Sequence, residues 1–546
     1  MSNRTQRVRF LLKNALIECI FLLFFQKLSE KDDFFTFLAE FLKIFVYICT
    51  KNHSNTMSNN YLIGRHAEKA TLDRLYKSKR AQFVAIYGRR RVGKSFLINE
   101  FFGDKLLLSV VGTYVKDADN DSMSYRRLQL EHFFDAVRLA DPSFADQPRP
   151  TCWREAFVML RQLLTKSTAN RKVVFFDELP WLAGPQSSEM IAELGYFWNS
   201  WAGARHDVML IVCGSATSWM LDNVIRDYGG LHGRLTEVIK LQPFSLSQCE
   251  EFYKERGLNL SRYEICVGYM AMGGIPYYMD KLRGDMSMTD NIDRLFFANR
   301  NIHQEFKDVY AGLYSSKDRY IDIVTALGSH FYGLTQAEIA AVLKIKSGGT
   351  LTKMLDNLTE SGIVRVYPRY GRRSRVETVY QLTDFFSLFY LRFINGHQHS
   401  RNQWNTLHRT PAYYTWTGET FELLCIAHLE QIKAALRLPS VERSYCWVGS
   451  TPEGTGVQID LVLESKAART DYVCEIKFAT TKFAVSKDYE LSLLNKVDAF
   501  ATAKLRNKTH SLQLVMIATM GVVDGRHSGA VNRVIDMDDL YADIRD

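Results

Sequence analysis

The chain has 546 residues, of which 47% are hydrophobic and 24% are charged. This composition is typical of globular proteins, and the length exceeds what one hydrophobic core supports, so we expect about three domains. The formal net charge of +9 is compatible with nucleic-acid contacts but does not require them. The nine cysteines form no C-x-x-C pair. This argues against a disulfide framework or zinc site and favours a reducing, cytoplasmic compartment.

Segment 1–57 differs from the rest of the chain. It has a basic start and two apolar runs, 15–25 and 34–49, which charged residues interrupt. Neither run supplies the roughly 20 clean apolar residues of a membrane span, and no small-residue cleavage site follows the first one. We expect Met57 to be the natural start and the protein not to associate with membranes. A membrane anchor is the alternative.

A phosphate-binding motif lies near the start of the predicted domain 58–285. Residues 88–95 match G-x-x-x-x-G-K-[ST], and their flanks predict a strand over 82–87 and a helix over 96–102. In this arrangement, backbone N–H groups at a helix N-terminus surround phosphate. Lys94 would face the β- and γ-phosphates and Ser95 would bind Mg²⁺. The residues expected to contact nucleotide here are Gly88, Arg89, Arg90, Arg91, Val92, Gly93, Lys94, Ser95 and Phe96.

Two further strands are predicted to carry catalytic groups. The apolar run 172–176 ends at Asp177, a second Mg²⁺ ligand, and Glu178, which would orient and activate water. The run 208–213 leads to Ser215 and Thr217. We expect this third strand between the other two, with either hydroxyl near the γ-phosphate. Simple capping of the next helix is the alternative.

The order of these motifs resembles the archaeal-type ATPases of the STAND branch of the AAA+-related P-loop proteins. Besides the motifs above, the resemblance rests on Ile63-Gly64-Arg65, Gly233-Arg234 and Gly274-Ile275-Pro276. It implies an α/β fold with a parallel-sheet core and a helical lid. It also implies that Ile63, Gly64, Arg65 and Pro276 flank the adenine, although His66 stands where an acidic residue is common.

The same resemblance implies a role for Arg234, as a γ-phosphate sensor or as a finger acting within or between subunits. Guanidinium groups suit this role because they bind phosphate bidentately. A structural ion pair is the alternative for Arg234. Many relatives assemble on activation, so self-assembly is a further expectation.

Segment 318–395, which follows a linker over 286–317, predicts a winged helix-turn-helix. The expected elements are helices over 320–327, from 334 and over 351–358, and strands over 363–367 and 376–382. The side chains expected to face DNA are Arg369, Arg372, Arg373 and Arg375 between the strands and Lys353, Asp356 and Asn357 on the third helix. Relay of the nucleotide state within the protein is an equal alternative.

Segment 412–546 resembles the PD-(D/E)XK nuclease superfamily, which implies an α/β restriction-endonuclease-like fold. A helix with Glu422 precedes a strand with Asp460 and a second strand on which Glu475 and Lys477 share one face. Asp460 and Glu475 would hold Mg²⁺, Glu422 would add a carboxylate, and Lys477 would steady the attacking water. Ile459 replaces the usual proline. The alternatives are ordinary surface ion pairs or a fold that binds nucleic acid without cutting it.

Together these patterns predict a cytoplasmic, ATP-hydrolysing switch of the STAND type with ATP and Mg²⁺ as cofactors. The switch would be coupled to a nuclease-like effector that acts on DNA or RNA. The first alternative is an ATP-gated DNA-binding regulator with an inactive nuclease fold, and the second is a membrane-tethered ATPase.

Overall fold

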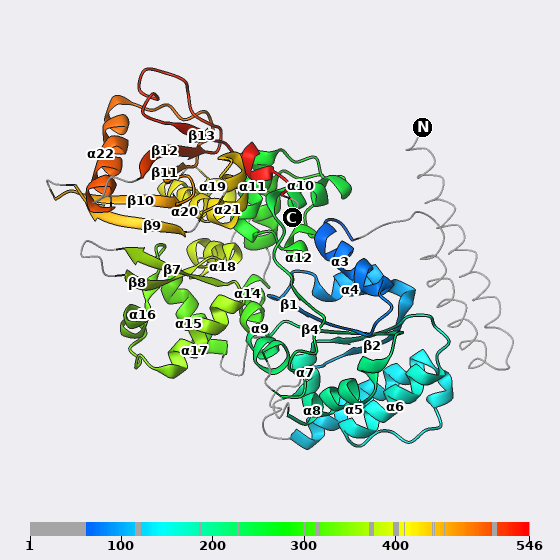
Figure 1. Cartoon of the computed structure of the whole chain (residues 1–546). Coiled ribbons are helices and arrows are strands. Elements are labelled where there is room, and N and C mark those ends of the chain that lie inside the picture. Colours follow the sequence, from blue (N-terminus) through cyan, green and yellow to red (C-terminus); the bar gives the residue numbers. More distant parts are fainter. Residues whose placement is uncertain are drawn as a thin grey trace, which may run out of the picture. The chain divides into compact units, whose positions relative to one another are not determined.

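The computed structural model describes residues 62–544, except for 115–121, 185–187, 227–228, 299–300, 312–316, 371–375, 397–402, 409, 439, 442, 452–453 and 505–509. Segment 1–57, Arg372, Arg373 and Arg375 lie outside these residues. The chain divides into two units, Met1–Tyr61 and Leu62–Asp546, and the second contains every described element (Figure 1). No helix in the described ranges is long and apolar enough to cross a membrane.

A five-stranded parallel sheet organises the first half of the described chain (Figure 1). Its strands are β1 (Gln82–Tyr87), β2 (Leu106–Val111), β3 (Lys172–Asp177), β4 (Val208–Gly214) and β5 (Glu237–Lys240). The order β2–β3–β4–β1–β5 places β4 between β1 and β3, as predicted. Every residue of β3 and β4 is buried, as expected for a parallel sheet covered on both faces.

Helices cover both faces of this sheet. Val84 and Ile86 of β1 pack in the same hydrophobic cluster as residues of α3 and α4. Phe83 and Ala85 point to the other face and pack with α5, α6 and α8. The helices of this half are α3 (His66–Lys77), α4 (Lys94–Phe102), α5 (Ser122–Ala140), α6 (Trp153–Lys166), α7 (Leu179–Ala183), α8 (Ser188–Ser200), α9 (Thr217–Met220), α10 (Leu246–Glu255), α11 (Arg262–Met272), α12 (Pro276–Met279), α13 (Met288–Ile292) and α14 (Ile302–Ala311).

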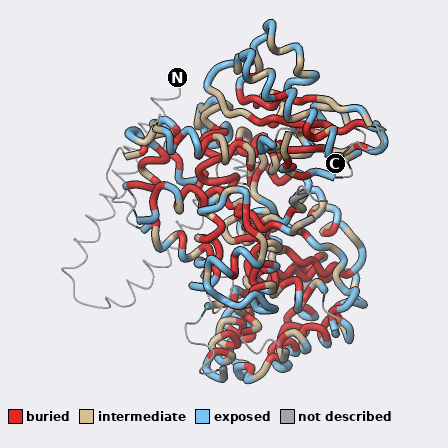
Figure 2. The backbone as a smooth tube through the Cα atoms, turned by 90° about the vertical axis from the view of Figure 1, so that its left-hand side faces the viewer, coloured by how far each residue is buried: buried red, intermediate tan, exposed pale blue. Residues whose placement is uncertain are grey.

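An eight-stranded sheet organises the second half, in the order β13–β12–β11–β10–β9–β7–β8–β6. Its strands are β6 (Leu334–Thr335), β7 (Val364–Tyr370), β8 (Val376–Leu382), β9 (Arg443–Ser450), β10 (Gly456–Ser465), β11 (Thr470–Lys477), β12 (Ser511–Ala518) and β13 (Arg533–Ile535). Among the described residues, the hairpin β7–β8 joins the C-terminal strands through the parallel pairing of Tyr370 with Trp447. Buried residues run through the strands of both halves (Figure 2).

The helices of the second half agree with most of the predicted elements. They are α15 (Lys317–Gly328), α16 (Gln336–Leu343), α17 (Gly349–Glu360), α18 (Phe385–Phe389), α19 (Gln403–Leu407), α20 (Pro411–Ala427), α21 (Leu429–Ala435) and α22 (Lys487–Lys504). Thr335 and Glu338 form a capping box at the start of α16, the helix expected from 334. The predicted helix with Glu422 is α20, which begins at Pro411 because Thr410 caps it and Pro411 occupies its first turn. It is interrupted at His428.

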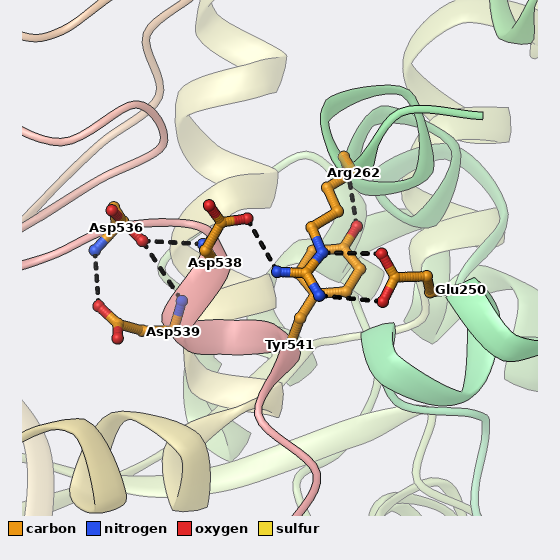
Figure 3. A network of polar contacts seen from close by, with 6 residues as sticks. All are labelled: Glu250, Arg262, Asp536, Asp538, Asp539 and Tyr541. Atoms are coloured by element: carbon orange, nitrogen blue, oxygen red, sulfur yellow. Dashed lines mark hydrogen bonds and ion pairs between the residues drawn. The ribbon is translucent and has the colours of Figure 1, made fainter.

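The C-terminal turn η7 (Asp538–Tyr541) is fastened to helices of the first half (Figure 3). Arg262 of α11 donates from Nε and Nη2 to both carboxylate oxygens of Glu250, at 2.7 and 3.1 Å, and from Nη1 to Asp538 at 3.0 Å. The buried Tyr541 donates its hydroxyl to the Arg262 carbonyl at 2.7 Å. The two halves therefore share a polar contact at the chain's C-terminal end.

His428 makes a second contact between the halves. Its ring is buried, donates from Nδ1 to Leu424 O at 2.9 Å, and accepts at Nε2 from the Leu246 N–H at 2.9 Å. Because a carbonyl can only accept and an amide can only donate, these partners fix the neutral tautomer. Burial lowers the pKa of His428 to about 4.

We expect His428 to make the protein acid-sensitive. Below pH 6.5 the unfolded chain binds a proton at this ring, whereas the folded protein does not until about pH 4. The free energy of unfolding should therefore fall by up to about 3 kcal/mol as the pH falls through this window. Urea unfolding between pH 7 and 4 should show a shallower loss for His428→Gln than for wild type. Exposed His66→Gln is the matched control. If the free energy of unfolding falls equally with pH in His428→Gln and in the wild type, the assignment is contradicted.

Candidate functional site

The phosphate loop, residues 88–95, joins β1 to α4 and has backbone geometry that requires glycine. A Cβ on Gly88 would lie 2.4 Å from the Leu241 carbonyl oxygen, so no side chain fits there. Gly93 has a φ of 91°, in the left-handed region that favours glycine. Lys94 is buried, and its Nζ donates to Gly88 O and Arg89 O at 3.0 Å each. Phosphate oxygens can replace these carbonyls, so the loop fits a nucleotide.

Asp177 is the last residue of β3 and is buried. Strand β3 belongs to the same parallel sheet as β1, the strand that leads into the phosphate loop. Asp177 Oδ1 accepts from the Glu178 N–H at 3.0 Å and from Cys213 Sγ at 3.1 Å. Burial raises the pKa of the Cys213 thiol, so this group remains a donor. Oδ2 accepts no hydrogen bond from any residue that the structure describes. Asp177 therefore retains an oxygen for Mg²⁺, a cation that prefers carboxylate and hydroxyl ligands.

Glu178 and Ser215 contact each other across neighbouring strands. Glu178 has a φ of 48°, and its Oε2 accepts from both the backbone N–H of Ser215, at 3.0 Å, and its hydroxyl, at 2.9 Å. Thr217 is buried, and its hydroxyl has no hydrogen-bond partner among the described residues. The residue capping α9 is Ala216, so neither hydroxyl caps that helix. Of the two predicted sensors, Ser215 is the one that contacts the acid.

Phe244 joins the two segments that the resemblance places around adenine. Arg65 is buried, donates from Nη2 to Val92 O at 3.0 Å, and stacks 4.4 Å from the centre of the Phe244 ring. Burial lowers the pKa of Arg65 to about 10. The Phe244 N–H donates to Gly274 O at 2.6 Å, and a Cβ on Gly274 would lie 1.9 Å from Phe244 O. Phe244 was missed because only its apolar character marks it in the sequence.

Other predicted nucleotide contacts lie in less enclosed positions. Ile63 and Pro276 are partly buried, and Phe96 is 45% exposed. Arg234 is exposed and makes no ion pair with any described residue, which disfavours the structural-ion-pair alternative within this part of the chain.

Arg89 leaves the phosphate loop to pair with Asp384, the residue that caps α18. Both side chains are buried, and the guanidinium donates directly to Asp384 Oδ1. Burial disfavours the charged form of Arg89, but the Asp384 carboxylate outweighs it and raises the pKa of Arg89. Asp384 Oδ2 also accepts from the Ser387 N–H at 3.1 Å and from its hydroxyl at 2.6 Å. The loop is thus tied to the segment that follows β8.

Arg90 and Arg91 bind helix α14. Arg90 donates from Nη1 to Asp308 O at 2.8 Å. Arg91 pairs with Glu305 and lies 4.1 Å from the centre of the Tyr277 ring. All three arginine side chains of the loop therefore bind residues outside it, which leaves the loop's backbone N–H groups for phosphate.

The C-terminal acidic cluster consists of Glu422, Asp460 and Glu475 with Lys477. Asp460 accepts from the Ile476 N–H at 3.0 Å, and Lys477 Nζ lies 3.0 Å from Glu475 Oε1. Burial and the nearby carboxylate charges raise the pKa of Glu422 and of Asp460. These mutual influences mean that the four side chains predicted to form one site do lie together.

Two residues of α22 complete the cluster and were missed in the sequence. Lys496 Nζ lies 2.6 Å from Glu475 Oε2, and Tyr489 donates its hydroxyl to Glu475 Oε1 at 2.7 Å. Burial alone would raise the pKa of Glu475, but the positive charges of Lys477 and Lys496 outweigh this effect, so the pKa is lowered. Tyr489 and Lys496 are seven residues apart on one helical face, a spacing that could have identified them. Within the described ranges, no group of three His, Cys, Asp or Glu side chains is arranged to hold a metal.

One expected DNA contact is wrong. Asn357 of α17 is buried and donates from Nδ2 to the Tyr320 hydroxyl at 2.7 Å, so it cannot reach a base. Lys353 and Asp356 are exposed on the same helix. The described cysteines, Cys152, Cys213, Cys249, Cys266, Cys425, Cys446 and Cys474, are free thiols in the structure.

We expect Ser215→Ala to slow nucleotide hydrolysis without weakening nucleotide binding. It removes one of the two hydrogen bonds that place Glu178, and a lost hydrogen bond of about 1.4 kcal/mol corresponds to a roughly tenfold lower kcat. Steady-state phosphate release and ATP titration would measure the two effects. Thr217→Val, which removes a hydroxyl without a described partner, is the matched control and should retain full activity. Equal loss in both variants would contradict a special role for Ser215.

Comparison with known proteins agrees with this geometry. Residues 62–282 match the family described as an ATPase domain predominantly from Archaea. An uncharacterized protein of Methanocaldococcus jannaschii is 25% identical over 345 residues, which cover 61% of this chain and 68% of that protein. The Walker-type ATPase PABY2304 of Pyrococcus abyssi aligns with a TM-score of 0.44 and 19% identity over 61% of this chain and 97% of its own. The ORC2 protein of Aeropyrum pernix aligns with a TM-score of 0.34 and 15% identity over 60% and 92%. Residues 62–282 therefore form an archaeal-type ATPase domain.

Proposed function

We propose that the protein is an ATP-hydrolysing switch of the STAND type, whose nucleotide state controls the segments after the ATPase domain. The observation that carries this proposal is that the arginines of the phosphate loop bind α14 and Asp384. If the loop changes its conformation when it binds phosphate, the arginine contacts to α14 and to Asp384 would therefore change as well. A ligand shifts such an equilibrium only through contacts that differ between the two states.

The nucleotide chemistry follows from residues already placed. Lys94 would exchange the carbonyls of Gly88 and Arg89 for phosphate oxygens, and Ser95 and Asp177 would hold Mg²⁺. The metal supplies charge neutralisation at the phosphates when it is bound. Hydrolysis requires the Glu178 carboxylate to orient water, so the contact between Glu178 and Ser215 sets its position.

Arg234 supports an additional proposal of self-assembly. Its exposure and its lack of an ion pair with the described residues suit a finger that reaches the nucleotide of another subunit.

Glu305→Gln tests the switch. The amide retains an acceptor for the Tyr278 hydroxyl, now 2.8 Å from Oε1, but loses the ion pair with Arg91. We expect ATP to bind with Kd changed less than about threefold, because the loop backbone is intact. The ATP-dependent change in hydrogen exchange over α14 should shrink by at least half. Lys307→Gln, an exposed change on the same helix, should behave as wild type. An unchanged exchange response in Glu305→Gln would contradict relay through this contact.

For the second half of the chain we propose a winged helix followed by a nuclease-like effector domain. Helices α15, α16 and α17 precede the hairpin β7–β8, which is the order of a winged helix-turn-helix. The meeting of Glu422, Asp460, Glu475 and Lys477 supports Mg²⁺-dependent phosphodiester cleavage of DNA or RNA.

The alternative, an ATP-gated regulator that binds nucleic acid without cutting it, is favoured by a specific observation. Both oxygens of Glu475 already have cationic partners, Lys477 and Lys496, and Tyr489 adds a third contact. A metal ion would have to displace at least one of these groups.

Cleavage assays distinguish the two effector functions. With plasmid DNA or structured RNA, Mg²⁺ and ATP, we expect cleavage by the wild type and at least a 100-fold loss in Asp460→Ala, because a metal ligand is removed. Glu464→Gln, on the same strand β10, is the control and should cut normally. If the wild type shifts nucleic acid on gels but never cuts, the regulator is correct. If Asp460→Ala cuts as fast as the wild type, the metal site is assigned wrongly.

A further inference from the structure

Tyr332 reaches the acidic cluster from a distant part of the sequence. It lies between α15 and β6, and the residue is 42% exposed. Its side chain is hydrogen-bonded to Gln458 of β10, two residues before Asp460. Burial raises the pKa of Tyr332, and the negative charges of Glu422 and Asp460 raise it further. The hydroxyl end of Tyr332 therefore lies near the carboxylates, while the residue keeps a large exposed surface.

The backbone that carries Tyr332 is held by the hairpin β7–β8. The Tyr332 carbonyl accepts from the hydroxyl of Tyr367 on β7, and the Phe331 carbonyl accepts from Gln381 Nε2 on β8 at 2.6 Å. Tyr367 and Gln381 are both buried. In the strand order, β7 is separated from β10 by β9 alone. These contacts involve the backbone of residues 331 and 332, so a change of the Tyr332 side chain leaves them intact.

Arg365 of β7 adds a positive charge near the same carboxylates. Its side chain is half-buried, donates from Nε to Gln381 at 2.6 Å, and places its guanidinium carbon 4.5 Å from the centre of the Tyr367 ring. Partial burial lowers the pKa of Arg365, and the Glu422 carboxylate is among the groups that oppose this effect. Arg365 forms no ion pair with any residue that the structure describes. A guanidinium in this position suits a phosphate group.

Helix α17 is poorly suited to read a DNA duplex. Asn357 is buried and bonded to Tyr320, which leaves Lys353 and Asp356 as the exposed members of the expected set. Readout in the major groove needs several side chains that reach base edges. Stacking is different, because an aromatic side chain contacts the face of a base only when that base is unpaired. The exposed Tyr332 therefore favours a single strand over a duplex.

We propose that the acidic cluster is part of a composite site for single-stranded nucleic acid, in which Tyr332 stacks on an unpaired base and Arg365 binds a nearby phosphate. The strand would lead from β7 toward Asp460 and Glu475. Tyr332 is thus a substrate-binding residue that comes from the segment before β6 and not from the C-terminal strands. This inference rests on the effector function proposed above and names the substrate class of that site.

Binding is measured in full-length Asp460→Asn, which retains an acceptor for the Ile476 N–H but weakens the proposed metal site, so that the nucleic acid stays intact. Labelled oligothymidine, oligouridine and a DNA duplex of equal length are titrated by fluorescence anisotropy with Mg²⁺. We expect at least one single strand to bind about tenfold tighter than the duplex. Adding Tyr332→Leu should weaken this binding about fivefold or more, the lower limit for the loss of one stacked base, and Tyr332→Phe should retain it. Adding Arg365→Gln should weaken it about tenfold.

The matched controls are Tyr196→Leu, an exposed tyrosine on α8, and Arg319→Gln, an exposed arginine on α15. Both should bind single strands as tightly as Asp460→Asn itself. Circular dichroism and ATP titration verify that each variant is folded.

Three outcomes would overturn the inference. One is single strands that bind no tighter than the duplex, the second is a Tyr332→Leu variant that binds as tightly as Tyr196→Leu, and the third is an equal loss in Tyr332→Phe and Tyr332→Leu.

Cleavage by proteins with an intact Asp460 is assayed in parallel and tests the effector function separately. If single strands bind through Tyr332 but the wild type never cuts them, the inference holds and the nuclease proposal is contradicted. If the wild type and Tyr332→Leu cut single strands and duplex at the same rates, the nuclease proposal holds and the inference is contradicted.

Discussion

The buried ion pair between Arg89 and Asp384 is the contact on which the relation between the two halves depends. Burying two charges is costly, and the cost is offset only where the pair has good geometry and further hydrogen bonds, which Ser387 supplies here. Breaking such a pair by removing one partner costs about 3–5 kcal/mol. This pair therefore holds the phosphate loop and the start of α18 in one arrangement. A conformational change in one of these segments would displace the other.

The two candidate sites handle negative charge differently. In the nucleotide site, Glu178 is held by a neutral serine and a backbone N–H, so no fixed cation competes for the carboxylate. In the acidic cluster, Glu475 is neutralised by Lys477 and Lys496. The first arrangement leaves the carboxylate without a cationic partner among the described residues, whereas in the second a metal ion would have to displace an ammonium group.

Local patterns were sufficient to predict most strands and the phosphate loop, because glycine geometry and apolar periodicity are encoded over a few residues. They were insufficient where the partner is distant in sequence. His428, where the helix is interrupted, accepts a hydrogen bond from the distant Leu246 N–H, and the buried Asn357 donates to the distant Tyr320 hydroxyl. The pairing of Arg89 with Asp384 spans 295 residues, so the loop motif alone suggests a phosphate contact for this side chain.

The seam between β7 and β9 has a mechanical consequence. Among the described residues, which leave out 371–375 directly after β7, the two parts of the eight-stranded sheet pair at Tyr370 with Trp447, whereas β10 and β11 pair over five successive residues. Within the residues that the structure describes, this is the shortest strand pairing of the sheet, and it joins the hairpin β7–β8 to the C-terminal strands. Separation of β7 from β9 would expose one edge of each strand, and unpaired strand edges can form backbone hydrogen bonds with other strands.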